Sequence, residues 1–441
     1  MRWMELQNVE FGECIVLGGA KREILMVDCG SSNNIIRDGN VGFDEYVKNG
    51  IMRRYRGMDR RAFLLTHCHR DHVCGLWTIL GVSPLYFNRL YLPVSPCDEK
   101  GDPLLLEFAL FVYAFLDRLT GYSRVNVCEL ELFGRAAKAA GAEAVFPIAQ
   151  GSGFVFDGAE YEVLWPARTG FPFPALFASA VEELNVRLSS PFLPACAGEF
   201  LRLKRAFCTA YRQACAVSPL TDEGVAELRA AFGRVSALIP SLRLLPCAGE
   251  IAALLENPVT QTAYSDTVNA ASVIFQNVRR QEASADDLLM TGDAPPESIE
   301  AVAERLYDAY YAVKVPHHGT ASFVSPILNG IAASHLLISN GEYRQGGQIA
   351  QEYAALAAVK HCTSPDACPW YKLNGACCNR LAACWEHSGG PSLTVRCPVY
   401  LRREKAFPCS IAVVSPSGRR ACFCEAGSAL PPEEERRTGI S

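Results

Sequence analysis

Six consecutive residues, HCHRDH at 67–72, carry the strongest chemical signal in the sequence. They directly follow the apolar run AFLLT, which predicts a short buried strand. In an extended turn, side chains at positions i and i+2 project to the same side, so His67 and His69 can bind one metal ion. Asp71 and His72 come from the next bend and can reach a second ion. Imidazole and carboxylate groups are ligands for zinc, manganese and iron, which favours a metal site over a histidine-rich polar loop.

Two further segments place metal-binding side chains at the ends of apolar runs. LLMTGD at 288–293 delivers Asp293, whose carboxylate could bridge two metal ions with one oxygen to each. VKVPHHG at 313–319 delivers His317 and His318. Each pattern is weak alone, because Gly-Asp turns and paired histidines are common. The order and spacing of all three segments indicate one metal centre.

These motifs together resemble the metallo-β-lactamase superfamily. Their pattern is most similar to the ComEC-like branch, the soluble hydrolase domain of DNA-uptake proteins and its stand-alone relatives. The resemblance covers about residues 5–166 and 262–345. Supporting segments are VDCG at 27–30, YEVLWP at 161–166, Asn269-x-x-Ser272 and LLISNG at 336–341.

The resemblance implies an α/β fold, an αββα sandwich, and a role for each motif residue. His67 and His69 would bind the first metal ion, Asp71, His72 and His318 the second, and Asp293 would bridge them. The catalytic residues would be Asp71, which orients the nucleophile or accepts its proton, and His317, which donates to the substrate. Around the ligands, Asp28 would hydrogen-bond the metal loop and Asn269 would serve as a weak substitute ligand.

The sequence departs from the family pattern in two places. Many members have a histidine just after the strand that here ends in YEVLWP, where this chain has Ala167 and Arg168. The first metal site would therefore lack its usual third histidine. The opening segment GECIVL at 12–17 replaces the branch's GQGD-type hairpin, and we interpret that change as structural.

The implied cofactors, two divalent ions of zinc or manganese, predict a hydrolase. Two ions about 3.5–4 Å apart can hold a hydroxide between them and stabilise the attacking and leaving oxygens. Phosphodiester hydrolysis suits such a site, which predicts a phosphodiesterase or nuclease with a phosphodiester or nucleic-acid substrate. The same hydroxide would attack a small ester, thioester or lactone, so a small-molecule substrate stays open. A non-catalytic, metal-stabilised binding module is the third alternative.

The chain reads as four segments. Residues 1–166 and 260–345 would form the two halves of the metallo-β-lactamase fold. Residues 167–259 have helical periodicity at 175–188, 199–215 and 222–238, which predicts a helical insertion, either a cap over the site or a peripheral support. Residues 346–441 form a Cys/His-rich extension with terminal strands.

The extension contains Cys362, Cys368, Cys378 and Cys384, which could hold a structural zinc ion. Their spacing is wider than that of a usual zinc knuckle, so a cysteine-rich loop with free thiols is the alternative. The extension could also bind a protein partner.

Composition sets the remaining limits. The 441 residues include 19 cysteines, and 42 Lys+Arg against 47 Asp+Glu give a net charge of −5, which excludes a strong overall attraction to nucleic acid. Five arginines at 53–61 could steer a phosphate backbone, but such runs are usually a solvated linker. The longest apolar stretch, at 103–116, is too short to span a bilayer and carries Glu107. With no apolar N-terminal leader, we expect no membrane contact and a cytoplasmic location.

Overall fold

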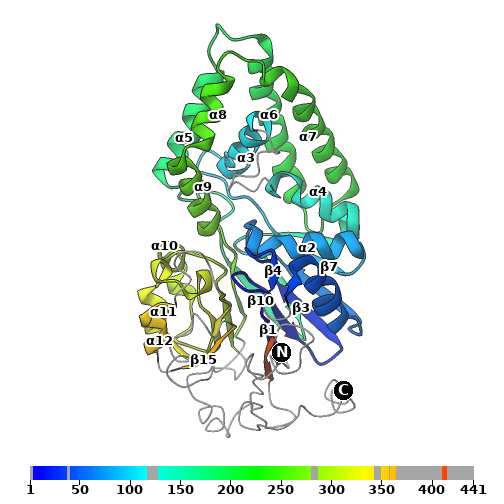
Figure 1. Ribbon diagram of the computed structural model, residues 1–441, viewed down its shortest axis with the longest axis vertical. Helices are drawn as coiled ribbons and strands as arrows, with labels where there is room; N and C mark the ends of the chain where they lie inside the picture. The colour runs from blue at the N-terminus through cyan, green and yellow to red at the C-terminus, as the bar shows by residue number, and fades with distance from the viewer. Residues whose placement is uncertain are drawn as a thin grey trace. The chain divides into compact units, whose positions relative to one another are not determined.

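The computed structural model describes residues 3–36, 40–116, 128–279, 287–341, 349–356, 358–363 and 410–414. The chain divides into two compact units (Figure 1). The first comprises 1–88, 151–165 and 272–441, and the second comprises 89–150 and 166–271. The helical segment predicted at 167–259 therefore shares a unit with residues 89–150.

Five strands of the first unit lie in the order β16-β1-β2-β3-β6. They are β1 (Trp3–Gln7), β2 (Ile15–Gly18), β3 (Glu23–Val27), β6 (Arg60–Leu64) and β16 (Ser410–Val414). β2 and β3 form the antiparallel hairpin that their apolar runs predict, with Leu17 opposite Leu25. β3 then runs parallel to β6, with Val27 opposite Leu64, so both strands end beside the HCHRDH motif.

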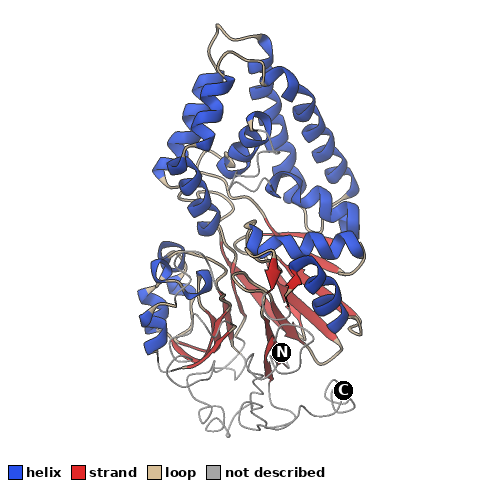
Figure 2. Cartoon of the chain, viewed as in Figure 1, coloured by secondary structure: helices blue, strands red, loops and turns tan. Residues whose placement is uncertain are grey.

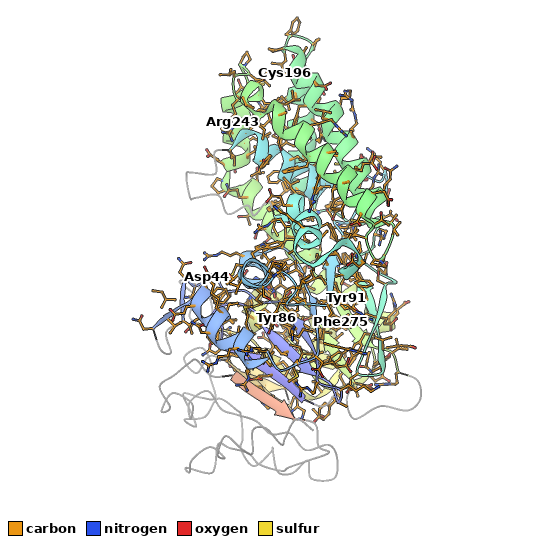
Figure 3. All side chains as sticks on the ribbon, turned by 90° about the vertical axis from the view of Figure 1, so that its right-hand side faces the viewer. Asp44, Tyr86, Tyr91, Cys196, Arg243 and Phe275 are labelled. Atoms are coloured by element: carbon orange, nitrogen blue, oxygen red, sulfur yellow. The ribbon has the colours of Figure 1, made fainter. Side chains whose placement is uncertain are left out.

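Seven further strands of the first unit form a mixed sheet, in the order β15-β14-β13-β12-β11-β10-β9. They are β9 (Gly153–Phe156), β10 (Ala159–Trp165), β11 (Ile274–Asn277), β12 (Leu288–Met290), β13 (Ala309–Lys314), β14 (Ala332–Ile338) and β15 (Val359–Cys362). β9 to β12 pair antiparallel and β12 to β15 pair parallel. Phe275 of β11, labelled in Figure 3, is buried edge-on against Phe154 at 5.5 Å.

Short helices connect these strands. They are α1 (Phe43–Glu45), a π-helix (Tyr46–Met52), α2 (Arg70–Val82), α10 (Pro296–Glu300), α11 (Pro326–Gly330) and α12 (Gln351–Ala355). A two-stranded ribbon, β4 (Ile35–Ile36) with β5 (Val41–Gly42), precedes α1. After β12, residues 296–306 form α10 and a 3₁₀ turn (Ala303–Arg305) rather than one continuous helix.

α2 begins inside the metal motif and packs tightly on the segment after β3. The Cys29 amide donates to the His72 carbonyl (2.8 Å), and the Gly75 amide donates to the Cys29 carbonyl (2.7 Å). A Cβ atom at Gly30 would lie 2.3 Å from the carbonyl carbon of Asp71, so only glycine allows this approach. The first turn of α2 is thereby fixed in place.

The second unit is mostly helical (Figure 2). Its parallel strand pair is β7 (Arg89–Pro93) with β8 (Val145–Ile148). Its helices are α3 (Leu104–Phe115), α4 (Cys128–Ala140), α5 (Ala175–Leu188), α6 (Ala195–Cys215), α7 (Asp222–Leu242), α8 (Ala248–Glu256) and α9 (Pro258–Ala270). The periodicity predicted α5 with its observed bounds. α6 begins at Ala195, four residues before the predicted start at Glu199, and its first turn directly follows Pro194.

The apolar stretch at 103–116 forms α3, a buried helix. Its one carboxylate, Glu107, is buried and pairs with the buried Lys204 of α6. Within the described part of the chain, no helix combines the length and apolar character that crossing a membrane requires.

Candidate metal centre

Strand ends of the first unit deliver the motif residues. His67 and His69 lie between β6 and α2, and Asp71 and His72 lie in the first turn of α2. Asp293 follows β12. His317 and His318 follow β13 in a 3₁₀ turn. Because β12 and β13 are parallel neighbours, their carboxyl ends meet at one edge of the sheet.

The structure brings most of these side chains into overlapping groups whose ligand atoms lie within 4.8 Å of one another. The groups are His67 with His72 and Asp293, Asp71 with His72 and His318, and Glu13 with Asp293 and His318. The second group matches the ligand set expected for the second metal ion. Among the described residues, His69 joins none of the three, although its Nδ1 lies 3.1 Å from Nε2 of His67.

Asp28 fixes the orientation of the metal loop, as the family resemblance implies. It is fully buried, and its carboxylate accepts from the Thr66 amide, the Thr66 hydroxyl and Nδ1 of His72, each at 2.7 Å. A carboxylate can only accept here, so His72 carries its hydrogen on Nδ1. Nε2 of His72 lies 3.2 Å from Oδ2 of Asp293, and because a carboxylate oxygen can only accept, a proton or a metal ion must lie between these two atoms.

The same logic fixes the imidazoles of His318 and His67. Nδ1 of His318 donates to the Ser339 carbonyl (2.9 Å). Nδ1 of His67 lies 3.1 Å from the Thr66 hydroxyl, whose own hydrogen goes to Asp28, so His67 must donate. All three rings therefore carry hydrogen on Nδ1, which leaves Nε2 as the atom that could bind a metal ion, the arrangement that ligand histidines adopt.

His318 supplies the test of whether a metal ion fits. Its Nε2 is buried and has no hydrogen-bond partner among the described residues. It lies 3.4 Å from Oδ2 of Asp293 and 3.7 Å from Oδ2 of Asp71. The backbone of His318 has φ +58°, in the left-handed region, and its carbonyl accepts from the Asn340 side chain (2.7 Å). A strained residue that aims an orphaned nitrogen at two carboxylates fits a divalent cation.

The pKa shifts point to a negative potential at the centre. Burial alone would lower the pKa of His72 and His318, but the carboxylate of Asp293 opposes it in both. With Asp28 also beside His72, the pKa of His72 lies well above its usual value. That of His318 rises to about 9. The pKa of Asp71 is lowered despite burial, because His318 and His72 stabilise its charged form. The site thus attracts cations.

His317 lies beside the centre and is a quarter exposed. Its ring stacks on Phe323, with 3.8 Å between centroids. The Thr320 hydroxyl donates to the His317 carbonyl (3.0 Å) and so accepts from Nδ1–H (2.7 Å), which leaves Nε2 without a hydrogen. Burial lowers the pKa of His317 to about 4, with His318 adding to the effect and Asp293 opposing it. Nε2 is therefore able to accept a proton, and the role of His317 as a donor to the substrate stays a prediction of the family resemblance.

Sequence reasoning missed two charged residues here, Glu13 and Lys314. Both are buried, and the Lys314 ammonium lies 3.1 Å from Oε2 of Glu13 and 3.3 Å from Oδ1 of Asp293. Burial would lower the pKa of Lys314, but Glu13 and Asp293 raise it, so the ammonium is charged. Two features of the sequence could have identified them. Lys314 is a charged residue inside the apolar run AVKV, and Glu13 is a charged residue just before a buried strand.

Glu13 lies behind the ring of His318. Its Oε2 approaches Nδ1 of that ring at 3.8 Å, and this nitrogen already donates to Ser339. The metal-facing Nε2 is on the opposite side of the ring. Glu13 thus belongs with Lys314 rather than with the ligands.

Two further predictions concern residues that are not part of these three groups. Asn269 is buried near the end of α9, in the second unit, and its Oδ1 has no hydrogen-bond partner in the part of the chain that the structure describes. Its role as a substitute ligand stays a prediction. Of the predicted structural zinc ligands, Cys362 is buried at the end of β15. Cys368, Cys378 and Cys384 lie outside the described residues.

Comparison with protein-family profiles and with curated proteins finds no match for this chain. The site must therefore be interpreted from its own geometry.

Proposed function

We propose that this chain is a metal-dependent hydrolase of the metallo-β-lactamase type, acting on phosphodiesters. One observation carries the proposal. His67, His72 and His318 each bind a neighbour through Nδ1, and His72 and His318 turn Nε2 toward Oδ2 of Asp293. Three imidazoles with ordered second nitrogens around buried carboxylates are typical of metal ligation and rare in ordinary packing.

The fold is in keeping with this proposal. Two mixed sheets contribute candidate ligands to one cluster, His67 and His72 from the first sheet's loops and Asp293 and His318 from the second's. We propose that they form the two central layers of an αββα sandwich.

The ligands would be His67, His69, Asp71, His72, Asp293 and His318. Bound divalent ions would supply a water nucleophile at neutral pH and would polarise a phosphoryl oxygen. Oδ2 of Asp71 accepts from the Ser32 hydroxyl (3.1 Å), which holds the carboxylate in its orientation at the edge of the cluster. Nε2 of His317, free of hydrogen, can accept a proton.

A phosphodiester is the substrate class we propose, because its transition state places charge on several oxygens at once. A cationic centre with a neighbouring proton acceptor suits that charge distribution.

The test is hydrolysis of bis-p-nitrophenyl phosphate by the purified protein with added zinc or manganese. We expect metal-dependent turnover that falls at least about 100-fold in Asp71→Asn, because this carboxylate is held in the cluster. The matched control is Asp44→Asn. Asp44 is an exposed aspartate, labelled in Figure 3, that also accepts from a hydroxyl, that of Thr78 (2.6 Å).

Ester, thioester and lactone substrates are assayed in parallel. Turnover of one of these alone would reject the phosphodiester class but keep the hydrolase. Failure of the wild-type protein to bind zinc or manganese would reject the metal centre itself.

A further inference from the structure

The ammonium group of Lys314 is a permanent cation buried beside the candidate metal centre. Lys314 ends β13 and is 1% exposed. Its Nζ donates to the Gly292 carbonyl (2.7 Å) and lies between Oε2 of Glu13 (3.1 Å) and Oδ1 of Asp293 (3.3 Å). The ammonium therefore donates to the Gly292 carbonyl and to Asp293, and its charge also pairs with the carboxylate of Glu13. A buried ammonium is tolerated only when its charge is paired in this way.

This contact divides the two oxygens of Asp293. Oδ1 faces the ammonium of Lys314. Oδ2 faces the histidines, at 3.2 Å from Nε2 of His72 and 3.4 Å from Nε2 of His318. The backbone supports the same orientation, because the Asp293 amide donates to the Ser272 hydroxyl (3.2 Å). The sequence had suggested one oxygen for each of two ions.

We propose that Lys314 is a positioning residue that makes Asp293 a one-oxygen ligand, with Glu13 anchoring the lysine. The inference rests on the proposed function, since it needs a metal ion at the centre. Oδ1 is occupied by a cation that the protein supplies, so Asp293 presents Oδ2 alone to any ion. Losing Lys314 would free Oδ1 and let the carboxylate rotate about its side-chain bonds.

A second role for Lys314, as a simple counter-charge to the carboxylates, predicts the opposite effect. Removing a positive charge from the neighbourhood would strengthen the attraction of a divalent cation. Removing a positioning group weakens binding, because the ligand must then be ordered by the metal itself. The sign of the change in metal affinity separates the two roles.

The experiment measures zinc affinity by competition with a chromophoric chelator for the wild type and Lys314→Met. Methionine keeps an unbranched chain of similar size and removes the charge. The matched control is Lys360→Met, because Lys360 is also buried but its ammonium bonds backbone carbonyls at Leu356 and Ala358. We expect about 10–100-fold weaker zinc binding in Lys314→Met and wild-type affinity in Lys360→Met.

Cobalt substitution gives a readout that a merely structural lysine would not change. If Asp293 gains use of Oδ1, its coordination changes, and the visible absorption of bound Co²⁺ should change in Lys314→Met but not in Lys360→Met. Unchanged or tighter zinc binding with an unchanged cobalt spectrum would overturn the proposal.

Glu13→Gln covers the case in which Lys314→Met does not fold, as judged by circular dichroism. This variant keeps the lysine but weakens its anchor, so we expect a smaller loss of zinc affinity in the same direction. Wild-type affinity in a folded Glu13→Gln would overturn the anchoring. Failure of the wild type to bind zinc would reject the proposed function, which distinguishes that failure from the failure of the role of Lys314.

Discussion

Replacing Asp28 with asparagine should weaken metal binding without unfolding the protein. Asp28 touches no candidate ion, yet it accepts from the Thr66 amide, the Thr66 hydroxyl and His72 Nδ1. Asparagine suits the site sterically, because it is nearly isosteric and tolerates the left-handed backbone found there (φ +55°). Asparagine differs chemically from aspartate in one respect, because its terminal NH₂ group is a hydrogen-bond donor where the carboxylate has an acceptor oxygen.

That donor creates a conflict. If the amide oxygen keeps the Thr66 amide hydrogen, the NH₂ group faces Nδ1 of His72. The ring must then move its hydrogen to Nε2, the nitrogen that faces Asp293. If the amide flips, its NH₂ opposes the Thr66 N–H, and an unsatisfied buried donor costs about 1–3 kcal/mol. Either way, we expect zinc affinity to fall about 10–100-fold, or about 1.4–2.8 kcal/mol.

The assay is chelator competition for zinc, with circular dichroism to establish folding. Asp287→Asn is the matched control, because Asp287 is also buried and accepts from the side chains of Asn277 (2.7 Å) and Arg279 (2.8 Å). It should keep wild-type zinc affinity. A folded Asp28→Asn that binds zinc as tightly as the wild type would refute the view that Asp28 sets the tautomer of His72.

Three further predictions concern packing, pH and metal removal. Gly30→Ala should lower the free energy of unfolding, measured in urea, by about 1–3 kcal/mol, because the new Cβ atom would meet the backbone of Asp71. Gly81→Ala is the control. Its Cβ atom would lie in open space on α2, so the higher helix propensity of alanine should raise the free energy of unfolding by about 0.5–1 kcal/mol. Burial raises the pKa of Glu129 from 4.5 to about 7, so the folded state holds a proton that the unfolded state loses above pH 4.5. Stability should therefore fall by about 3 kcal/mol between those values, and Glu129→Gln, unfolded in urea at about pH 5 and pH 8, should lack that loss. Removing metal with a chelator should lower the thermal midpoint, and restoring zinc to about 100 times its dissociation constant should recover about 2.7 kcal/mol.

Local pattern was enough to predict several parts of the structure. The hairpin of β2 and β3 follows from two apolar runs separated by a glycine-rich turn, and α5 follows from helical periodicity alone. The family resemblance implied the grouping of Asp71, His72 and His318. Strand pattern alone could not predict it, because Asp71 and His72 follow a strand of one sheet and His318 follows a strand of the other.

Long-range pairing was not predictable from the same patterns. Glu13 and Lys314 lie 301 positions apart in the sequence, and their contact depends on how two sheets are brought together. Likewise, periodicity shows that 175–188 is helical but not which residues it packs on. The structure groups that helix with residues 89–150, whereas the sequence suggested a separate insertion.

The charges of the candidate centre favour a cation. It contains four buried or largely buried carboxylates, those of Glu13, Asp28, Asp71 and Asp293, and one ammonium, that of Lys314, which contacts Glu13 and Asp293. With neutral imidazoles this leaves three uncompensated negative charges, an arrangement too costly to persist in a protein interior. Protonation relieves part of it, as the raised pKa values of His72, His318 and Glu13 indicate. A divalent ion would neutralise the remainder while leaving each imidazole in the tautomer that its Nδ1 partner already fixes, which supports the proposed metal site.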